Sequence, residues 1–373
     1  MARTLKSDRT LFVVTVLLVA VSVVMVYSAS AVQAQARFQN GEHFLLKQIA
    51  WACLGVGALL VVMHVDYHEY RRPALIWSLV AVVLVGLVAV FLFRPTNGTQ
   101  RWIAIGPASI QPSELAKLAA IVFAAALLER RMHRVNEIPY AVAPIAAVTV
   151  ILASLIVKEP DFGTALVLVL VVTTILFAAG LSYRHLLALF LMMLPPAIAL
   201  VVFWPYRLQR LMTFWDPWKE RLGAGFQAVQ ALIAVGSGGW FGKGLMAGVQ
   251  KLFYIPEPHT DFIFAVIGEE LGLVGTTLVL VCFVVICWRG LRAAVLAPDR
   301  FGALLALGLT TMVTLQALVN VSVVIALLPT KGIPLPLVSN GGSSLLINLV
   351  GMGILLNISQ QGSRAPMRPA PES

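Results

Sequence analysis

Residues 11–27, LFVVTVLLVAVSVVMVY, decide the class of fold, because they form an apolar run without a single charged residue. A helix of this length can cross the hydrocarbon core of a bilayer. The whole chain has the same character: 59% of its 373 residues are hydrophobic and only 12% are charged, which is about half the charged share of a soluble domain. This composition excludes a soluble globular protein, a disordered chain and a nucleic-acid-binding protein. It leaves a membrane protein that crosses the bilayer many times.

A cleaved signal peptide is the alternative interpretation of this first run. Basic residues precede the run, and SASAVQAQA at 28–36 has the small-residue spacing of a cleavage site. The run is longer than the usual apolar region of a signal peptide. We therefore expect it to be retained as the first transmembrane helix.

Ten apolar runs of spanning length predict about ten transmembrane helices. A segment surrounded by lipid must satisfy its own backbone hydrogen bonds, so each run is expected to be helical. The predicted fold class is an all-α integral membrane protein with a single polytopic domain, 1–360, and a disordered cytoplasmic tail, 361–373. The runs cover 11–30, 44–64, 74–93, 113–128, 140–157, 163–180, 186–204, 261–288, 302–328 and 344–359.

The distribution of lysine and arginine predicts the orientation. Ten crossings place both termini on one side of the membrane, and the loops and termini of that side carry the larger share of the basic residues. Basic residues are enriched in cytoplasmic loops, so both termini are predicted to be cytoplasmic. The net charge of +10 is explained in this way and by anionic head groups, without a nucleic-acid partner.

One long interruption, residues 205–260, separates the seventh predicted helix from the eighth and is expected to be extracytoplasmic. YRLQRLMTFW at 206–215 alternates basic and apolar residues with a helical period, as an interfacial helix does. GAGFQAVQALIAVGSGG at 223–239 is expected either to re-enter the outer leaflet or to lie on it. Dense glycine from Gly236 to Gly248 predicts positive φ angles or close backbone approach. Long ordered loops are usually functional, and a flexible outside loop is the alternative.

Three pairs of charged residues lie inside or at the ends of the apolar runs. Charge in a bilayer is costly, which makes such residues functional candidates, for example along a polar pathway. Each pair also has a structural interpretation. Glu114 and Lys117 can form a salt bridge within one helix. Glu159 and Asp161 can belong to an ordinary polar turn, and Glu269 and Glu270 can fix helix packing beside small residues. The pairs are Glu114 with Lys117, Glu159 with Asp161, and Glu269 with Glu270.

Asp261 is the main candidate for catalysis. It follows PEPHT at 256–260, whose two prolines end any preceding helix. Thr260 is a candidate N-cap, which would place Asp261 in the first turn of the eighth predicted helix. The helix dipole lowers the pKa of a carboxylate there, so we expect Asp261 to be ionised at neutral pH. It then suits a proton acceptor or a metal ligand, and the alternative is a cap with no further role.

Basic and aromatic side chains in the same outer segments indicate a substrate class. Cations bind phosphate and aromatic rings stack on sugars, so these residues suit a lipid that carries a pyrophosphate and a sugar. The chain has no Walker loop, no dinucleotide fingerprint and no metal-ligand spacing of its three cysteines. The candidates for substrate binding are Arg101, Trp102, Arg207, Arg210, Lys243, Lys251 and His259.

Four long motifs resemble the SEDS family (shape, elongation, division and sporulation), which includes FtsW, RodA and SpoVE. The resemblance covers essentially the whole chain, and the segment that contains Thr330 and Lys331 is more like the division-type FtsW branch than the RodA branch, which usually has Val-Thr there. Asn340 departs from the family, which generally has tyrosine in SYGGSS, so a role of that tyrosine is not carried over. The motifs are NGTQRWIAIGPASIQPSELAKL (97–118), GAGFQAVQALIAVGSGGWFGKGL (223–245), YIPEPHTDFIFAVIGEELGLVG (254–275) and LLPTKGIPLPLVSNGGSSLLINLVGMGILLNI (327–358).

The resemblance implies a peptidoglycan glycosyltransferase of the bacterial cytoplasmic (inner) membrane that polymerises lipid II during cell division. It implies that Asp261 is required for polymerisation and that Trp102 is associated with activity. The transfer would be inverting, with undecaprenyl pyrophosphate as the leaving group. One carboxylate base is then sufficient, because pyrophosphate leaves without the protonation that a leaving alcohol needs.

Cofactor, partners and rival functions follow from the same resemblance. No cofactor is required by the sequence, although a divalent cation, Mg²⁺ or Mn²⁺, would suit the pyrophosphate. The implied partners are a class B penicillin-binding protein, which acts as transpeptidase, and other divisome membrane proteins. Two alternatives remain: a lipid II flippase, which is a transporter, and a non-catalytic divisome scaffold.

Overall fold

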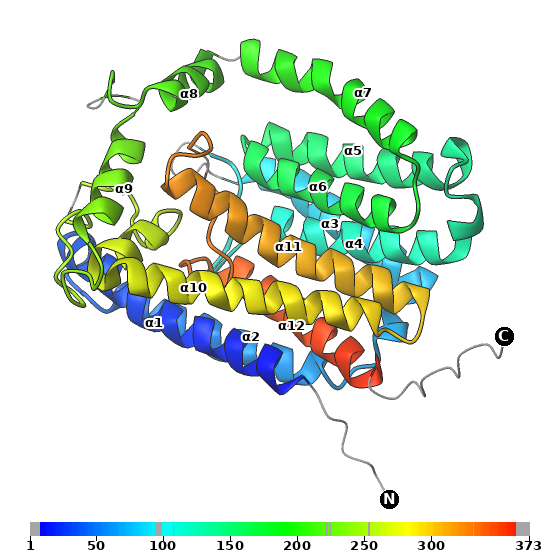
Figure 1. The fold of residues 1–373 in the computed structure, drawn as a ribbon, viewed down its shortest axis with the longest axis horizontal. Helices are drawn as coiled ribbons and strands as arrows, with labels where there is room; N and C mark the ends of the chain where they lie inside the picture. Colours follow the sequence, from blue (N-terminus) through cyan, green and yellow to red (C-terminus); the bar gives the residue numbers. More distant parts are fainter. Residues whose placement is uncertain are drawn as a thin grey trace, which may run out of the picture.

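The computed structural model describes residues 8–93, 99–106, 108–203, 205–220, 223, 225–252, 254–330 and 332–362. Within these residues the chain forms twelve α-helices and one short β-hairpin. Figure 1 shows the long helices packed side by side with their axes roughly aligned, while α7 (Tyr183–Val202) and α8 (Pro205–Trp215) run along one edge of the bundle. The predicted helical membrane fold is confirmed.

Each of the ten apolar runs contains one helix. By length and hydropathy, seven helical segments in the described residues are sufficient to cross a membrane: α1, α2, α10, α11 and α12, together with α3 extended to Leu92 and α5 extended back to Ile138. The count of ten crossings therefore stays a prediction. The ten helices are α1 (Arg9–Phe38), α2 (His43–Val62), α3 (Pro73–Ala89), α4 (Pro112–Arg131), α5 (Ala143–Lys158), α6 (Phe162–Ala178), α7 (Tyr183–Val202), α10 (Ile263–Val295), α11 (Arg300–Val324) and α12 (Gly342–Gly362).

Local signals explain where several helices begin. Asp161 and Asp299 cap α6 and α11, because each side chain accepts a hydrogen bond from a backbone amide of the first turn. Proline occupies the first position of α3 and α4, where it costs no hydrogen bond. At the other end of the chain, α12 extends to Gly362, so the first two residues of the predicted tail are helical. The residues beyond 362 lie outside the described part of the chain.

Shorter elements connect the helices, and the prediction of an all-α fold missed one of them. β1 (Ile103–Ile105) and β2 (Ala108–Ile110) form an antiparallel hairpin in which Ile103 pairs with Ile110. Gly106, with φ of 59°, lies in its turn, where a left-handed backbone favours glycine. The remaining short helices are η1 (Tyr67–Arg71), η2 (Val90–Leu92), η3 (Met132–Arg134) and η4 (Ile138–Val142).

The long loop is largely ordered and contains two helices. α8 (Pro205–Trp215) confirms the helix predicted at 206–215. α9 (Phe226–Ser237) lies in the second predicted segment and packs against α10 and α11. It is therefore part of the packed structure, which excludes a flexible connection over these residues.

α10 is interrupted at Gly272, whose φ of 65° and ψ of −160° are not helical. The glycine-rich loop crosses the helix at this point, and the amides of Leu273 and Val274 donate to the carbonyls of Gly239 and Trp240, at 2.9 and 3.1 Å. In return, the amides of residues 243 and 244 donate to the carbonyls of residues 269 and 270. The loop thus satisfies backbone groups that the break releases, as a buried interruption requires.

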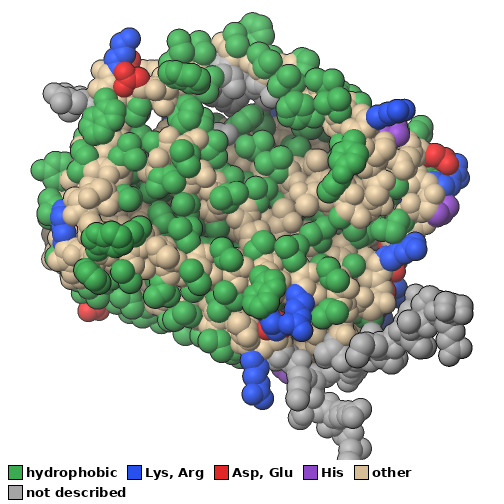
Figure 2. Space-filling model, viewed as in Figure 1, with side chains coloured by type: hydrophobic (Ala, Val, Ile, Leu, Met, Phe, Trp, Pro, Cys, Tyr) green, Lys and Arg blue, Asp and Glu red, His purple; other side chains and the backbone are tan. Residues whose placement is uncertain are grey.

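The two ends of the bundle differ in what they carry. Asp8, which caps α1, forms an ion pair of 2.6 Å with Arg289 near the end of α10, and Gly362 approaches the carbonyl of Leu296. The beginning of α1 and the end of α12 therefore lie at the end of the bundle where α10 finishes (Figure 1). Asp261 precedes the opposite end of α10. Figure 2 shows a broad face of hydrophobic side chains between these ends, with charged side chains gathered around its periphery.

Candidate functional site

Asp261 lies in the turn before α10, and its predicted position in the first helical turn is wrong. The helix begins at Ile263 with Phe262 as its N-cap residue. Thr260 does not cap it, because the Thr260 hydroxyl donates instead to the carbonyl of Glu257 at 2.9 Å. The carboxyl group of Asp261 therefore stands outside the helix.

The environment of Asp261 also corrects its predicted ionisation. Burial of the carboxyl group raises the pKa of Asp261 to about 7. The positive charges of Arg101 and Arg210 lower that pKa, while Asp161 and Glu257 raise it further. At neutral pH, Asp261 is therefore present in both its ionised and its protonated form. Such a pKa suits a general base, which works best when its pKa lies near the operating pH.

Asp261 and Arg101 both approach Gly332. A Cβ added to Gly332 would lie 2.9 Å from Asp261 Oδ2 and 3.6 Å from Arg101 Nη1. Arg101 itself is held by backbone carbonyls: its Nε donates to Glu159 at 3.2 Å and its Nη2 donates to Pro160 at 2.5 Å. Since these partners carry no net charge, they orient the guanidinium without neutralising it.

Glu159 and Asp161 belong to the turn whose carbonyls hold Arg101, and they differ in their partners. Asp161 Oδ2 accepts hydrogen bonds from Gln111 and from the Thr164 hydroxyl, at 3.0 and 2.9 Å. Glu159 is fully buried, and within the described residues neither of its carboxyl oxygens has a hydrogen-bond partner. Burial, followed by the charge of Asp161, raises the pKa of Glu159 to about 8, so this group is mostly protonated at neutral pH.

The backbone of residues 259–261 is fixed from three directions. Each of their three carbonyls accepts a hydrogen bond, and the amide of Asn340 donates to the first, that of His259, at 2.9 Å. The Ser339 hydroxyl donates to the second at 2.5 Å, and the Asn320 side chain donates to the third at 2.8 Å. Residues 332–340, between α11 and α12, are called the 332–340 segment below. This stretch lies within the motif at 327–358, but none of these roles was predicted from the sequence.

The predicted Glu114–Lys117 contact is present and belongs to a buried network behind the 332–340 segment. Lys117 Nζ lies 3.0 Å from the Glu114 carboxylate, which also accepts from the Ser344 hydroxyl at 2.9 Å. Lys117 donates as well to Gln316 Oε1 at 2.5 Å, and Gln316 donates to the carbonyl of Pro334 at 3.1 Å. The ion pair therefore has hydrogen-bond partners throughout, as a buried pair requires.

Two of the predicted pyrophosphate ligands are paired with carboxylates inside the protein. Lys251 is 3% exposed, and its ammonium lies 2.6 Å from Glu270. Lys243 lies 2.7 Å from Glu269, and its side chain is 33% exposed. The same carboxylates accept backbone amides of residues 246, 249 and 250. Glu269 and Glu270 therefore hold the glycine-rich loop against α10, and the structure does not bring these four residues to Asp261.

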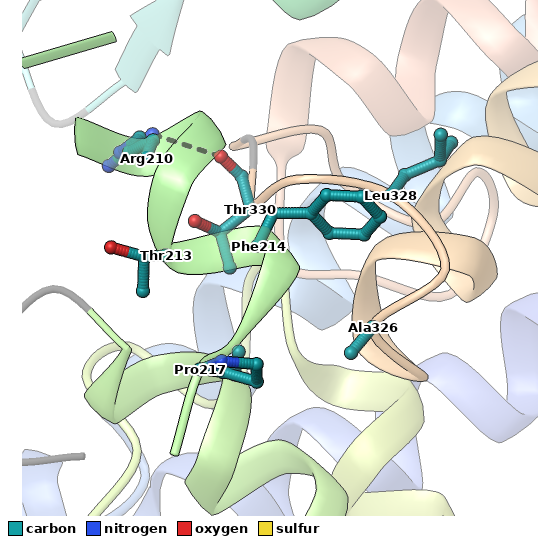
Figure 3. A pocket seen from close by; sticks show the side chains of 8 residues that line it. Arg210, Thr213, Phe214, Pro217, Ala326, Leu328 and Thr330 are labelled. Carbon is teal, nitrogen blue, oxygen red and sulfur yellow. Dashed lines mark hydrogen bonds between the residues drawn. The ribbon is translucent and has the colours of Figure 1, made fainter. Parts of the chain in front are cut away.

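Arg210 joins α8 to the loop that leads to Gly332. Its Nη1 donates to the carbonyl of Thr330 at 3.2 Å, as Figure 3 shows. Phe214 and Thr330 help to line a small cavity beside this contact, with a volume of about 10 Å³. Arg210 is also close enough to lower the pKa of Asp261. The side chain of Arg207, one turn earlier, lies outside the described residues.

His259 and Trp102 flank this arrangement. His259 is buried against the ring of Phe44, with ring centroids 4.4 Å apart, and burial lowers its pKa to about 4. It is therefore neutral at physiological pH and cannot supply a cation to a phosphate. Trp102 is half-buried and directly precedes β1, next to Arg101. Its predicted contact with substrate stays a prediction.

A divalent cation would find few ligands from the protein alone. Within the described residues, no three side chains of His, Cys, Asp or Glu are grouped as metal ligands. Glu159, whose carbonyl holds Arg101, is mostly protonated at neutral pH and is a poor metal ligand in that form. An ion bound here would therefore need oxygen ligands from the substrate itself, in the manner of Mg²⁺ on phosphates.

Comparison with known proteins identifies relatives along the whole chain. The model of the cell cycle protein family that includes FtsW, RodA and SpoVE matches residues 8–364. Stage V sporulation protein E of Bacillus subtilis is 40% identical over 95% of this chain and 97% of its own. The probable peptidoglycan glycosyltransferase FtsW of Trichlorobacter lovleyi is 42% identical over 96% of this chain and 95% of its own.

Solved structures give the same result. A chain from a structure titled "Structural coordination of polymerization and crosslinking by a peptidoglycan synthase complex" matches with a TM-score of 0.79 and 30% identity, over 97% of this chain and 100% of that chain. The rod shape determining protein RodA of Thermus thermophilus matches with a TM-score of 0.70 and 28% identity, over 97% of this chain and 99% of that chain.

Proposed function

We propose a mechanism on the premise that this chain belongs to the FtsW, RodA and SpoVE family of cell cycle proteins. It is a peptidoglycan glycosyltransferase that polymerises glycan strands, and its substrate in our proposal is lipid II. The relatives named FtsW, at 39–42% identity, support a role in cell division. We place the enzyme in the bacterial cytoplasmic membrane with both termini in the cytoplasm.

This orientation puts the Asp261 end of the bundle outside the cytoplasm. The termini-proximal ends of α1 and α12 lie with the end of α10, whereas Asp261 lies before its beginning. If the basic loops are cytoplasmic, as the positive-inside rule predicts, the site faces the side where the cell wall is built.

The proposed base is Asp261 in its ionised form. Its carboxylate takes the proton of the acceptor's GlcNAc 4-hydroxyl as that oxygen bonds to the anomeric carbon of the donor. The bond from this carbon to the pyrophosphate breaks at the same time, and the electron pair leaves with undecaprenyl pyrophosphate, so the configuration inverts. The leaving group needs no proton, and therefore the site needs no second acidic group.

Arg101 is the proposed partner of the leaving pyrophosphate. The observation that carries the proposal is that a carboxyl group with a pKa of about 7 and a guanidinium both approach Gly332. The planar guanidinium of Arg101 can donate charge-assisted hydrogen bonds to phosphate oxygens. Arg210 is the second cation, and Arg207 and Trp102 remain candidates from the sequence. Lys243 and Lys251 are left out because Glu269 and Glu270 pair with them.

A transpeptidase partner completes the proposal. The similar chain of known structure belongs to a peptidoglycan synthase complex of polymerization and crosslinking. We propose a class B penicillin-binding protein as the crosslinking partner of this chain, together with other divisome membrane proteins.

The proposal is tested with purified protein and lipid II in detergent, where a flippase has no membrane across which to act. We expect the wild-type protein to make long glycan and Asp261→Asn to lose about 10²–10⁴-fold in rate, the range of general-base catalysis. The matched control is Glu137→Gln, an exposed carboxylate at the opposite end of the bundle. Wild-type protein that makes no glycan but moves lipid II across vesicles would indicate the flippase. Normal polymerisation by Asp261→Asn would reject the base.

A further inference from the structure

We propose that Asn320 is a positioning residue that fixes the geometry between Asp261 and Arg101. Asn320 lies on α11 and is 1% exposed. Its Nδ2 donates to the carbonyl of Asp261 at 2.8 Å and to the carbonyl of Ile333 at 2.7 Å. One side-chain amide therefore joins the turn before α10 to the 332–340 segment. The inference rests on the proposed role of Asp261 as the base.

The second of these hydrogen bonds matters because Ile333 follows Gly332. The Asp261 carboxyl and the Arg101 guanidinium both approach Gly332. By holding the carbonyl of Ile333, Asn320 fixes this glycine against the pair. By holding the carbonyl of Asp261, it fixes the base on the other side of the same gap.

The other fixed points do not replace Asn320. Ser339 and Asn340 hold the carbonyls of residues 260 and 259, so they restrain the approach to Asp261 but not Asp261 itself. Both belong to the 332–340 segment, which is irregular. Asn320 instead belongs to α11, a helix of 25 residues whose neighbouring side chains are largely buried. Rigid elements hold reacting groups more precisely than loops do.

Loss of the amide leaves two buried carbonyl groups without this donor. The turn then has freedom to relax and to expose the Asp261 carboxyl to solvent. A displacement of about 1 Å at a reacting group costs about 10²-fold in rate. The same relaxation reduces the burial that raises the pKa of Asp261. The charged groups that act on this carboxyl remain Arg101, Arg210, Asp161 and Glu257.

The test compares Asn320→Leu with Asn348→Leu, because leucine keeps the side-chain volume and removes the donor. Asn348 is equally buried, at 1% exposed, but its amide donates at 2.8 Å to the carbonyl of Ser344 in its own helix. Purified variants are assayed with lipid II for kcat, KM and the pH dependence of kcat/KM. We expect Asn320→Leu to lose about 10²-fold in kcat with little change in KM. We also expect the acidic limb of its pH profile of kcat/KM to move to lower pH, because less burial lowers the pKa of Asp261. Asn348→Leu should keep the acidic limb of the wild-type profile.

A loss of packing elsewhere in the bundle would leave the burial of Asp261, and therefore the acidic limb, unchanged. An unchanged limb and kcat in Asn320→Leu, or the same loss in Asn348→Leu, would overturn the proposal. Gly332→Ala provides a second test that removes no buried amide, since its methyl group enters the gap 2.9 Å from Asp261 Oδ2. It should lower kcat, and normal kcat here would also count against the proposal. If Asp261→Asn is inactive while both variants behave like the wild type, the base assignment stands and the positioning role fails.

Discussion

The Arg101 guanidinium lies beside the Asp261 carboxyl and opposes the effect of burial on its pKa. The remaining pKa of about 7 is well above the ordinary value of 3.8. A base must be ionised to accept a proton. The balance between the burial of Asp261 and the positive charge of Arg101 therefore sets the pH above which the proposed base can act.

Polymerisation by the wild-type protein should therefore rise with pH through about 7. Below this pKa the protonated carboxyl group cannot act as a base, and above it the carboxylate predominates. The measurement is kcat/KM with lipid II from mildly acidic to mildly alkaline pH, with protein stability followed in the same buffers. A rate that is already maximal near the ordinary aspartate pKa would contradict the assignment.

Arg101→Ala should move the acidic limb to higher pH and lower the rate. The cation lowers the pKa of Asp261, so its removal lets burial and the neighbouring carboxylates raise that pKa further. Arg101→Lys is the control that keeps the charge but replaces the planar donor set that reaches the carbonyls of Glu159 and Pro160. Its limb should stay closer to the wild type, and equal limbs in both variants would argue against electrostatic control by Arg101.

Lys251→Met should destabilise the protein because it leaves the fully buried Glu270 without its cation. Breaking a buried ion pair by removing one partner costs about 3–5 kcal/mol. The double variant Lys251→Met with Glu270→Gln should recover much of this loss. Thermal unfolding in detergent measures both. If Lys251→Met keeps its unfolding temperature but loses affinity for lipid II, the lysine is a substrate ligand after all.

Glu159→Gln should stabilise the protein, increasingly as the pH rises. Folding raises the pKa of this carboxyl from 4.5 to about 8. Between these two pKa values the folded state binds a proton that the unfolded state has released. The free energy of unfolding of the wild type therefore decreases as the pH rises through this range. Glutamine keeps the shape without a charge. The difference in unfolding temperature between variant and wild type should grow from mildly acidic pH to about 8, and a constant difference would refute the buried, protonated state.

Much of the fold follows from local sequence. The ten apolar runs are each long enough to require helical hydrogen bonding, and each of them contains a helix. The alternation of basic and apolar residues at 206–215 is likewise a property of neighbouring residues, and it identifies α8. The short hairpin around Gly106 was missed because three-residue strands carry little periodic signal.

Features of the site that depend on distant residues could not be predicted in this way. The pKa of Asp261 is set by burial, and burial depends on segments from three other parts of the chain. Lys251 and Glu270 are 19 residues apart in sequence, with no local pattern that joins them. Asn320 was not among the candidate residues, because nothing in the neighbouring sequence indicates that its amide reaches Asp261.

The interruption of α10 at Gly272 has a consequence for hybrids between related chains. A methyl group on this glycine would lie 2.3 Å from the amide nitrogen of Gly242 and 2.6 Å from the carbonyl oxygen of Trp240. Helix and loop thus share one set of backbone partners, although they are separate in sequence. Residues 238–251 and 269–274 should therefore be exchanged together in a chimera. A chimera that exchanges only one of them combines a loop and a helix from different proteins at this close backbone contact.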